Sequence, residues 1–221
     1  MSYTNGLDKP SDYFTTKLFT GNGGTNAITG VGFQPDWIWF KNRTSAQSHA
    51  IVDSVRGRKG LQSNATEAEY TLASGKDFGT FDSDGFTVLT PQQLNSFNYN
   101  TGSIVSWNWV AGTSFTNDAS GTGIGSIDSA GSASDASGFS ICSYTGTGSN
   151  ATVKHGLSTT PSMIIHKRRD DASGWPTWHT SLGTSIMELN ETGAVQSGSS
   201  YTNGTAPTSS VFSIGTSGDI N

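Results

Sequence analysis

Residues 35–41 read Pro-Asp-Trp-Ile-Trp-Phe-Lys, and residues 161–167 read Pro-Ser-Met-Ile-Ile-His-Lys. The offset of 126 residues that aligns these stretches holds without a gap from 35/161 to 95/221, where 14 of the 61 pairs are identical. Composition bias alone does not readily produce a match of that length. Upstream, Phe14 and the run 19–23 have counterparts in Phe139 and the run 144–148. The sequence therefore predicts two copies of one domain in tandem.

The two copies differ in length. Copy one continues past Asn95 to Gly112 and includes 104–110, an alternating apolar run that is typical of a strand. Copy two stops at Asn221, the counterpart of Asn95 in this alignment. We therefore expect copy two to lack its closing strand, which would leave unpaired backbone groups at a sheet edge. Either the natural chain continues with an alternating segment, or a neighbouring subunit donates the strand.

The domain organisation predicted from this duplication has four parts. An N-terminal lead-in or docking segment covers 1–12, and the first β domain covers 13–112. A linker rich in Ser, Gly, Ala and Asp covers 113–137, with one short strand expected near 124–127, and the second, incomplete β domain covers 138–221. A unit of about 100 residues can bury its own core, whereas solenoid repeats are shorter and rely on their neighbours.

Short apolar runs separated by Gly-rich and Asn-rich turns fill both copies, and the best helical candidate, 67–72, is too short to form a stable helix. We predict an all-β fold with two tandem homologous domains that resemble a β-sandwich or jelly roll. The expected strands are 14–19, 26–31, 37–41, 50–55, 86–89 and 104–110 in copy one, and 139–144, 151–155, 163–167, 177–179, 186–189 and 211–214 in copy two.

The tryptophans of copy one alternate along two of these strands. Trp37 and Trp39 are two residues apart and share one sheet face. Met163 and Ile165 replace them in copy two, which favours a core position over a sugar-binding one. The same interpretation covers Trp107 and Trp109.

Composition argues against several classes of protein. The net charge of -5 gives no electrostatic reason to expect nucleic-acid binding. Cys142 is the single cysteine, so neither an intrachain disulfide nor a cysteine-cluster metal site is expected. The N-terminal residues lack the basic start and apolar run of a signal peptide, and no stretch has the length of a membrane span. We expect synthesis in a cytoplasm and no membrane insertion.

Catalysis and metal binding are not expected. Glycoside hydrolysis usually needs two carboxylates across a cleft, yet Asp36 and Asp53 align with Ser162 and His179, so no carboxylate pair survives the duplication. The run 81–86 begins like a calcium loop but lacks the remaining ligands, and we interpret it as a turn. The prediction is therefore a protein that is not an enzyme, with no catalytic residues, cofactor or metal.

The densest polar group of copy one offers a candidate binding surface. It contains Arg43, His49, Asp53 and Arg56. At the matching places copy two has Arg169, Trp175, His179 and Leu182, and the first three of these complete the candidate set. The alternative interpretation is a solvated strand edge.

Nearly the whole chain resembles virion structural proteins of tailed phages, especially marine and freshwater cyanophages. The stretches that carry the resemblance are 3–14, 19–23, 32–41, 53–57 and 81–86 in copy one, and 143–148, 155–157, 161–165, 167–169 and 181–183 in copy two. In this family each copy usually ends in an alternating strand like 104–110, so the stop at Asn221 departs from the pattern.

The resemblance implies a structural component of a phage particle, such as a tail fibre or appendage protein, with its N-terminal part attached to the virion. Its partners would be other tail or capsid proteins and further copies of itself, as a trimer. The alternative is an adhesin or receptor-binding module that recognises a host surface glycan, and a polysaccharide depolymerase is a third hypothesis, which the duplication disfavours. The resemblance carries no catalytic residues.

Overall fold

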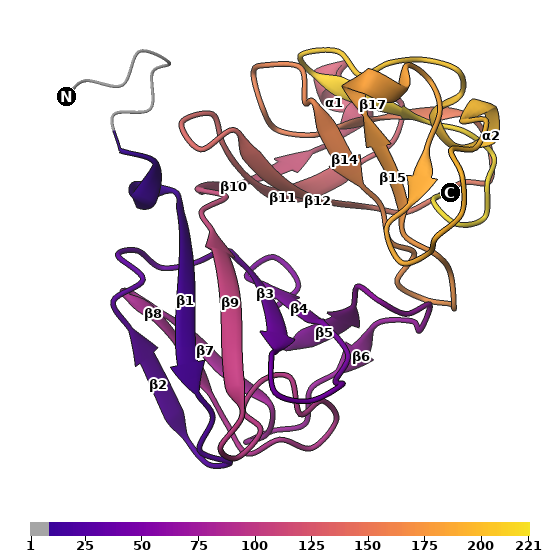
Figure 1. Cartoon of the computed structure of the whole chain (residues 1–221). Helices are drawn as coiled ribbons and strands as arrows, with labels where there is room; N and C mark the ends of the chain where they lie inside the picture. The colour runs from indigo at the N-terminus through magenta and orange to yellow at the C-terminus, as the bar shows by residue number, and fades with distance from the viewer. Residues whose placement is uncertain (1–8) are drawn as a thin grey trace. The chain divides into compact units, whose positions relative to one another are not determined.

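The computed structural model describes residues 9–221 and confirms the all-β class, since strands dominate and the helical elements are short (Figure 1). The chain divides into two compact units. The first runs to Ser63 and resumes at Glu69–Ala111, and the second consists of Asn64–Ala68 and Gly112–Asn221. The second unit thus includes a loop whose sequence lies within copy one.

The first unit is built from two antiparallel sheets. The larger has the strand order β1-β9-β3-β4-β5-β6, and the smaller has the order β2-β8-β7. The elements are η1 (Pro10–Asp12), β1 (Phe14–Thr20), β2 (Asn26–Thr29), β3 (Trp37–Asn42), β4 (Ala50–Asp53), β5 (Lys59–Gln62), β6 (Tyr70–Thr71), β7 (Phe78–Asp82), β8 (Gly85–Val88) and β9 (Ser103–Trp109).

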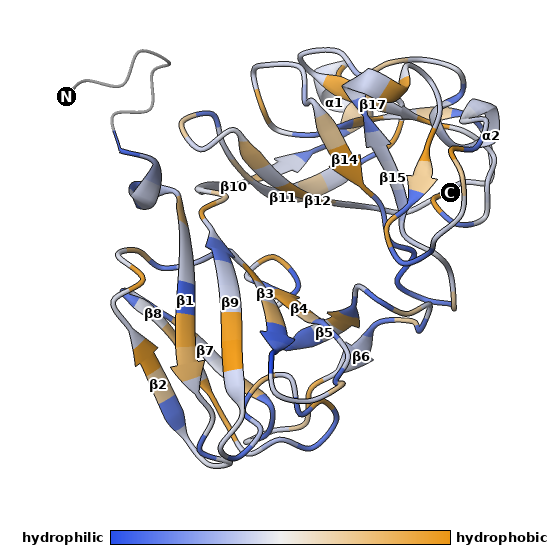
Figure 2. Ribbon diagram, in the orientation of Figure 1, coloured by the Kyte–Doolittle hydropathy of each residue, from blue (hydrophilic) through white to orange (hydrophobic). Residues whose placement is uncertain are grey.

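The core of the first unit lies between its two sheets. Ile38 and Phe40 of β3 are fully buried and meet Phe78 and Phe86 from the smaller sheet. Because side chains alternate across a strand, this packing turns the other residues of β3 toward the outer face. Figure 2 shows that apolar and polar residues also occur together along β1, β2 and β9. This two-sheet arrangement is that of a β-sandwich.

The second unit has three small sheets, with strand orders β10-β11-β12, β14-β15-β16 and β13-β17. Its core includes Val153, Phe212 and Ile214. The elements are β10 (Thr113–Asn117), α1 (Ala119–Thr122), β11 (Ser129–Ser134), β12 (Phe139–Tyr144), β13 (Ala151–Lys154), β14 (Met163–Ile165), β15 (Pro176–His179), η2 (Thr180–Leu182), β16 (Met187–Glu188), α2 (Ser199–Thr202) and β17 (Val211–Ile214).

Strand pairing repeats between the units with the offset read from the sequence. Ile38 pairs with Val52, and Ile164 pairs with Trp178, so β14 and β15 reproduce β3 and β4. The pairing of β5 with β4 recurs as β16 with β15, and that of β2 with β8 recurs as β13 with β17. Register is fixed by which residues face the core, so its repetition reflects a repeated fold.

The linker predicted from the sequence is wrong. The predicted linker 113–137 forms β10, α1 and β11, and it pairs with β12 as part of the second unit. Its polar, glycine-rich composition hid the strands because these have few large side chains. The segment 67–72, expected to be too short for a stable helix, contains strand β6. The lead-in predicted at 1–12 forms η1 over Pro10–Asp12, and its residues 1–8 lie outside the described part of the chain.

Candidate functional site

A row of aromatic rings crosses the outer face of the larger sheet in the first unit. The register places Phe14 beside Trp109, Trp109 beside Trp37, and Trp107 beside Trp39. The ring centroids in these three pairs are 4.6, 4.7 and 6.0 Å apart, and those of Trp37 and Trp39 are 5.7 Å apart. Tilted and edge-to-face contacts of this kind stabilise aromatic pairs, and cross-strand pairing fixes their order.

The expectation that Trp37 and Trp39 fill the core is wrong. Both are half-buried on the outer face, while their neighbours Ile38 and Phe40 take the core positions with no exposed surface. The same holds for Trp107, which is half-buried beside the fully buried Ser106 and Asn108 of β9. Period-two alternation predicted that the tryptophans share a face, but it did not say which face meets the second sheet.

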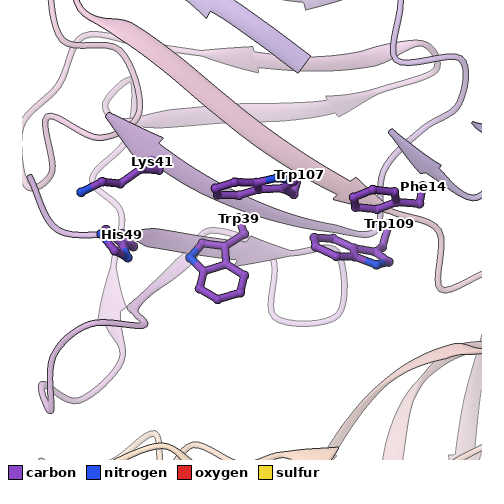
Figure 3. A pocket seen from close by; sticks show the side chains of 6 residues that line it. All are labelled: Phe14, Trp39, Lys41, His49, Trp107 and Trp109. Carbon is purple, nitrogen blue, oxygen red and sulfur yellow. The ribbon is translucent and has the colours of Figure 1, made fainter. Parts of the chain in front are cut away.

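All of these rings except that of Trp37 line a shallow pocket with a volume of about 470 Å³ (Figure 3). Its lining is almost wholly apolar and consists of Phe14, Trp39, Lys41, His49, Trp107 and Trp109. Figure 3 shows Phe14 and Trp109 at one end and Lys41 and His49 at the other. The pocket therefore has an aromatic floor with basic side chains at one end.

Polar groups of the pocket are few. The ammonium group of Lys41 donates to the C=O of Gln47 at 3.3 Å, which holds it at the pocket end. Burial, with the Lys41 charge as a smaller cause, lowers the pKa of His49 from its ordinary value. Both causes favour the neutral imidazole of His49. The indole N–H of Trp39 is buried and has no hydrogen-bond acceptor among the described residues.

Of the predicted candidates, Asp53 and Arg56 form an internal ion-pair network instead of a binding surface. The Arg56 Nε lies 2.6 Å from the Asp53 carboxylate, and its Nη1 lies 2.9 Å from the Glu69 carboxylate. The exposed fractions of these side chains are 7%, 3% and 8%. The network therefore fastens the loop after β4 to the segment before β6.

The remaining candidates are dispersed. His49 lines the aromatic pocket, whereas Arg43 lies exposed after β3. Trp175 is buried in the second unit, where its indole N–H donates to the C=O of Ala65 at 3.0 Å. His179 is exposed and caps η2 by accepting from the N–H of Ser181. Arg169 is exposed beside a polar depression. The seven candidates do not form one surface.

The turn interpretation of 81–86 agrees with the structure. Asp84 follows β7, and its carboxylate accepts the N–H groups of Gly30 and Gly32 at 2.9 and 2.7 Å. These hydrogen bonds lower the pKa of Asp84. The carboxylate joins two loops of the first unit. Among residues 9–221, no group of three or more His, Cys, Asp or Glu side chains is arranged to hold a metal ion.

The geometry defines an all-β protein of two related units, the first of which carries an aromatic pocket. The chain belongs to the family described as a domain of unknown function, DUF7483, which matches residues 9–221. Neither a curated protein nor a solved structure matches the chain. Within residues 9–221, no helix has the length and apolar character needed to cross a membrane.

Proposed function

We propose that the first unit binds saccharides on the aromatic face made by Phe14, Trp37, Trp39, Trp107 and Trp109. The observation that carries this proposal is a continuous row of rings on the outer face of a sheet, where antiparallel sheets ordinarily place polar side chains. A sugar ring presents a face of C–H groups that can pack on an aromatic ring. Its hydroxyl groups stay in water at the open side of a shallow pocket. Apolar pockets with few polar groups are typical of ligand sites.

Lys41 indicates the class of saccharide. Its ammonium group lies at one end of the pocket, and the imidazole of His49 beside it, whose neutral form is favoured, adds hydrogen-bonding capacity. A carboxylate or sulfate on the sugar would pair with this cation. The preferred ligand is therefore an anionic polysaccharide, such as one that contains uronic acid or sulfate ester groups.

A phage particle is the setting we propose for this binding. The resemblance of the chain to virion structural proteins supports a tail fibre or appendage protein that contacts other virion proteins and assembles as a trimer. A non-catalytic binding module fits that role, since the site offers ring faces and one cation. In this proposal the second unit contributes to assembly.

The test is a glycan array followed by titration calorimetry on the intact chain. We expect binding to anionic polysaccharides, and Trp39→Ala and Trp107→Ala should each weaken it at least tenfold. Leu18→Ala is the matched control, because Leu18 is exposed on β1 and does not line the pocket. Lys41→Met should weaken binding of the anionic ligands and leave neutral analogues unchanged.

Two outcomes would contradict the proposal. One is an array with no binder, and the other is equal affinity of the wild type and both tryptophan variants. Release of reducing sugar from a bound polysaccharide would show an enzyme instead of a binding module. The virion setting is tested separately, by imaging labelled particles with an antibody against this chain.

A further inference from the structure

Within residues 9–221, β12 and β14 of the second unit are terminal strands of their sheets, so each has one edge with no strand partner. β12 pairs only with β11, and β14 pairs only with β15 among the strands of the described chain. Their counterparts in the first unit, β1 and β3, both pair with β9, which lies between them. The place between β12 and β14 therefore corresponds to the position of β9. We call it the strand slot.

Aromatic packing shows that β12 and β14 keep the positions of β1 and β3. In each unit, one phenylalanine of the opposite sheet contacts two rings, each of which lies in a flanking strand or directly after it. These triads are Phe19, Phe86 and Phe40, with centroid distances of 5.9 and 5.2 Å, and Tyr144, Phe212 and His166, with distances of 5.9 and 5.4 Å. The two flanking strands are thus anchored on β17 as β1 and β3 are anchored on β8.

β11 lies on the side of β12 that is away from the strand slot. Ile127, just before β11, forms a bridge with Val153 of β13. β17 occupies the other edge of β13 and carries Phe212 beneath the slot. β11 and β10 therefore extend the sheet in the opposite direction, as Figure 1 also shows. No strand of residues 9–221 lies in the slot.

The backbone of β14 directs hydrogen-bonding groups into the slot. The N–H of His166 donates to the C=O of Pro176 at 2.9 Å, so His166 and Ile164 face β15. In an antiparallel strand the intervening residues face the opposite edge. Met163 and Ile165 therefore point their N–H and C=O groups into the slot, and their side chains are 50% and 37% exposed.

The corresponding residues of the first unit are paired. Trp37 pairs with Trp109 and Trp39 with Trp107, both in β9. The N–H of Arg43 donates to the C=O of Ser103 at 2.7 Å, which places these odd-numbered residues of β3 toward β9. Equivalent backbone groups thus pair with a strand in the first unit and lie at an unpaired strand edge in the second.

We propose that the strand slot binds one β-strand, antiparallel to both β12 and β14. β9 gives the chemistry of this strand. Its inward residues Ile104, Ser106 and Asn108 have no exposed surface. Its outward residues include Trp107 and Trp109, which cover the rings of β3. The bound strand therefore has one large apolar residue and small or polar residues inward, and large apolar residues outward, over Met163 and Ile165.

The occupant is a polypeptide strand with the chemistry of β9, because the described strands of residues 9–221 already pair within their own sheets. Strand addition of this kind gives affinity through main-chain hydrogen bonds and specificity through alternate side chains. The inference is independent of saccharide binding, which concerns the first unit.

A peptide that copies Gly102–Ala111 tests the proposal on the intact chain. A fluorescent form should bind in solution, measured by anisotropy. Amide hydrogen exchange should then slow in β12 and β14, with β1 and β3 unchanged. In β9 the N–H groups of Val105 and Trp107 face β3. N-methylation at both positions should therefore weaken binding at least tenfold while leaving the protein unaltered.

A protein variant provides the second arm. Ile165→Pro removes one N–H from the slot edge and spares the pairing with β15, since proline is tolerated at a strand edge. It should lose peptide binding and keep the circular dichroism spectrum of the wild type. If this variant does not fold, the N-methylated peptide still decides the question.

Three results would overturn the proposal. They are absence of peptide binding, equal binding of the N-methylated peptide, and exchange protection located in β1 and β3 instead of β12 and β14. A chain with residues 99–111 repeated after Asn221 distinguishes the source of the strand. If protection of β12 and β14 appears only in that tethered form, donation by a separate chain is excluded.

Discussion

The side chains of Asn98 and Asn221 share three hydrogen bonds in their respective units. Each side-chain amide donates to two backbone carbonyls, and its oxygen accepts from a backbone N–H, at equivalent places. The partners are Gly24, Leu89 and Asn22 for Asn98, and Ser149, Gly215 and Thr147 for Asn221. The oxygen of Asn221 also accepts from the N–H of Gly148. The residues before them, Phe97 and Ile220, both belong to the buried cores. A single asparagine thus joins three segments in each unit.

This relationship corrects the end of the sequence alignment. The constant offset pairs Asn221 with Asn95, whereas the structure pairs it with Asn98. Copy two therefore has three fewer residues between β17 and this asparagine than copy one has after β8. Loop length changes at little cost in free energy, but the three segments must still be joined.

Asn98→Ala should lower the free energy of unfolding by about 1–3 kcal/mol, because it leaves buried carbonyl groups and an N–H without partners. Asn95→Ala is the control, since Asn95 is exposed, and should change stability by less than about 0.5 kcal/mol. Urea unfolding of both variants provides the measurement. Equal effects would contradict the structural pairing of Asn98 with Asn221.

Phe40→Ala and Trp39→Ala should differ in their cost in stability, because the two residues lie on opposite faces of β3. Phe40 is fully buried, so its truncation should cost about 3–5 kcal/mol through loss of transfer energy and formation of a cavity. Trp39 is half-buried on the outer face, and its truncation should cost roughly 1–2 kcal/mol. Denaturant unfolding compares them. A larger cost for Trp39→Ala would place its ring in the core.

Arg56→Ala should destabilise the first unit by about 3–5 kcal/mol, because it removes the buried cation that lies within 2.9 Å of the carboxylates of Asp53 and Glu69. Lys59→Met is the matched control. Lys59 lies 4.0 Å from the same Glu69 but is 40% exposed, so its loss should cost less than about 1 kcal/mol. Thermal unfolding at fixed pH measures the stability of both variants. Similar effects would show that burial does not decide how much an ion pair contributes to stability.

Stability of the second unit should depend on pH through His166. Burial lowers the pKa of His166 from 6.5 to about 4, so the unfolded chain takes up a proton more readily than the folded one. The contribution of neutral, buried His166 to the free energy of unfolding is fully present above pH 6.5. It is lost as the pH falls toward about 4. His166→Phe, which restores the residue of copy one, should flatten this dependence.

The measurement is urea unfolding between pH 7 and pH 4, monitored by amide exchange in the second unit. It compares the wild type with His166→Phe. Burial also lowers the pKa of His155, so a smaller slope in the same direction should remain in the variant. Identical pH dependence of the free energy of unfolding in the two proteins would show that His166 does not contribute to it.

The sequence by itself determined the all-β class and the presence of two related copies in tandem. It also determined the shared face of Trp37 and Trp39. These features follow from local patterns: alternation of apolar residues, turns rich in glycine and asparagine, and a repeat with a constant offset. Each depends on residues near one another in the chain or on direct comparison of the copies, so the printed sequence contains the information.

The tertiary structure alone decided which face of β3 meets the second sheet and which strand edges remain unpaired. It also showed that residues 113–137, with few large side chains, form two strands because β12 offers an edge on which to pair. The aromatic pocket collects residues from β1, β3 and β9 that lie far apart in the sequence. Alternation is symmetric between the two faces of a strand, and only packing against a distant partner breaks that symmetry.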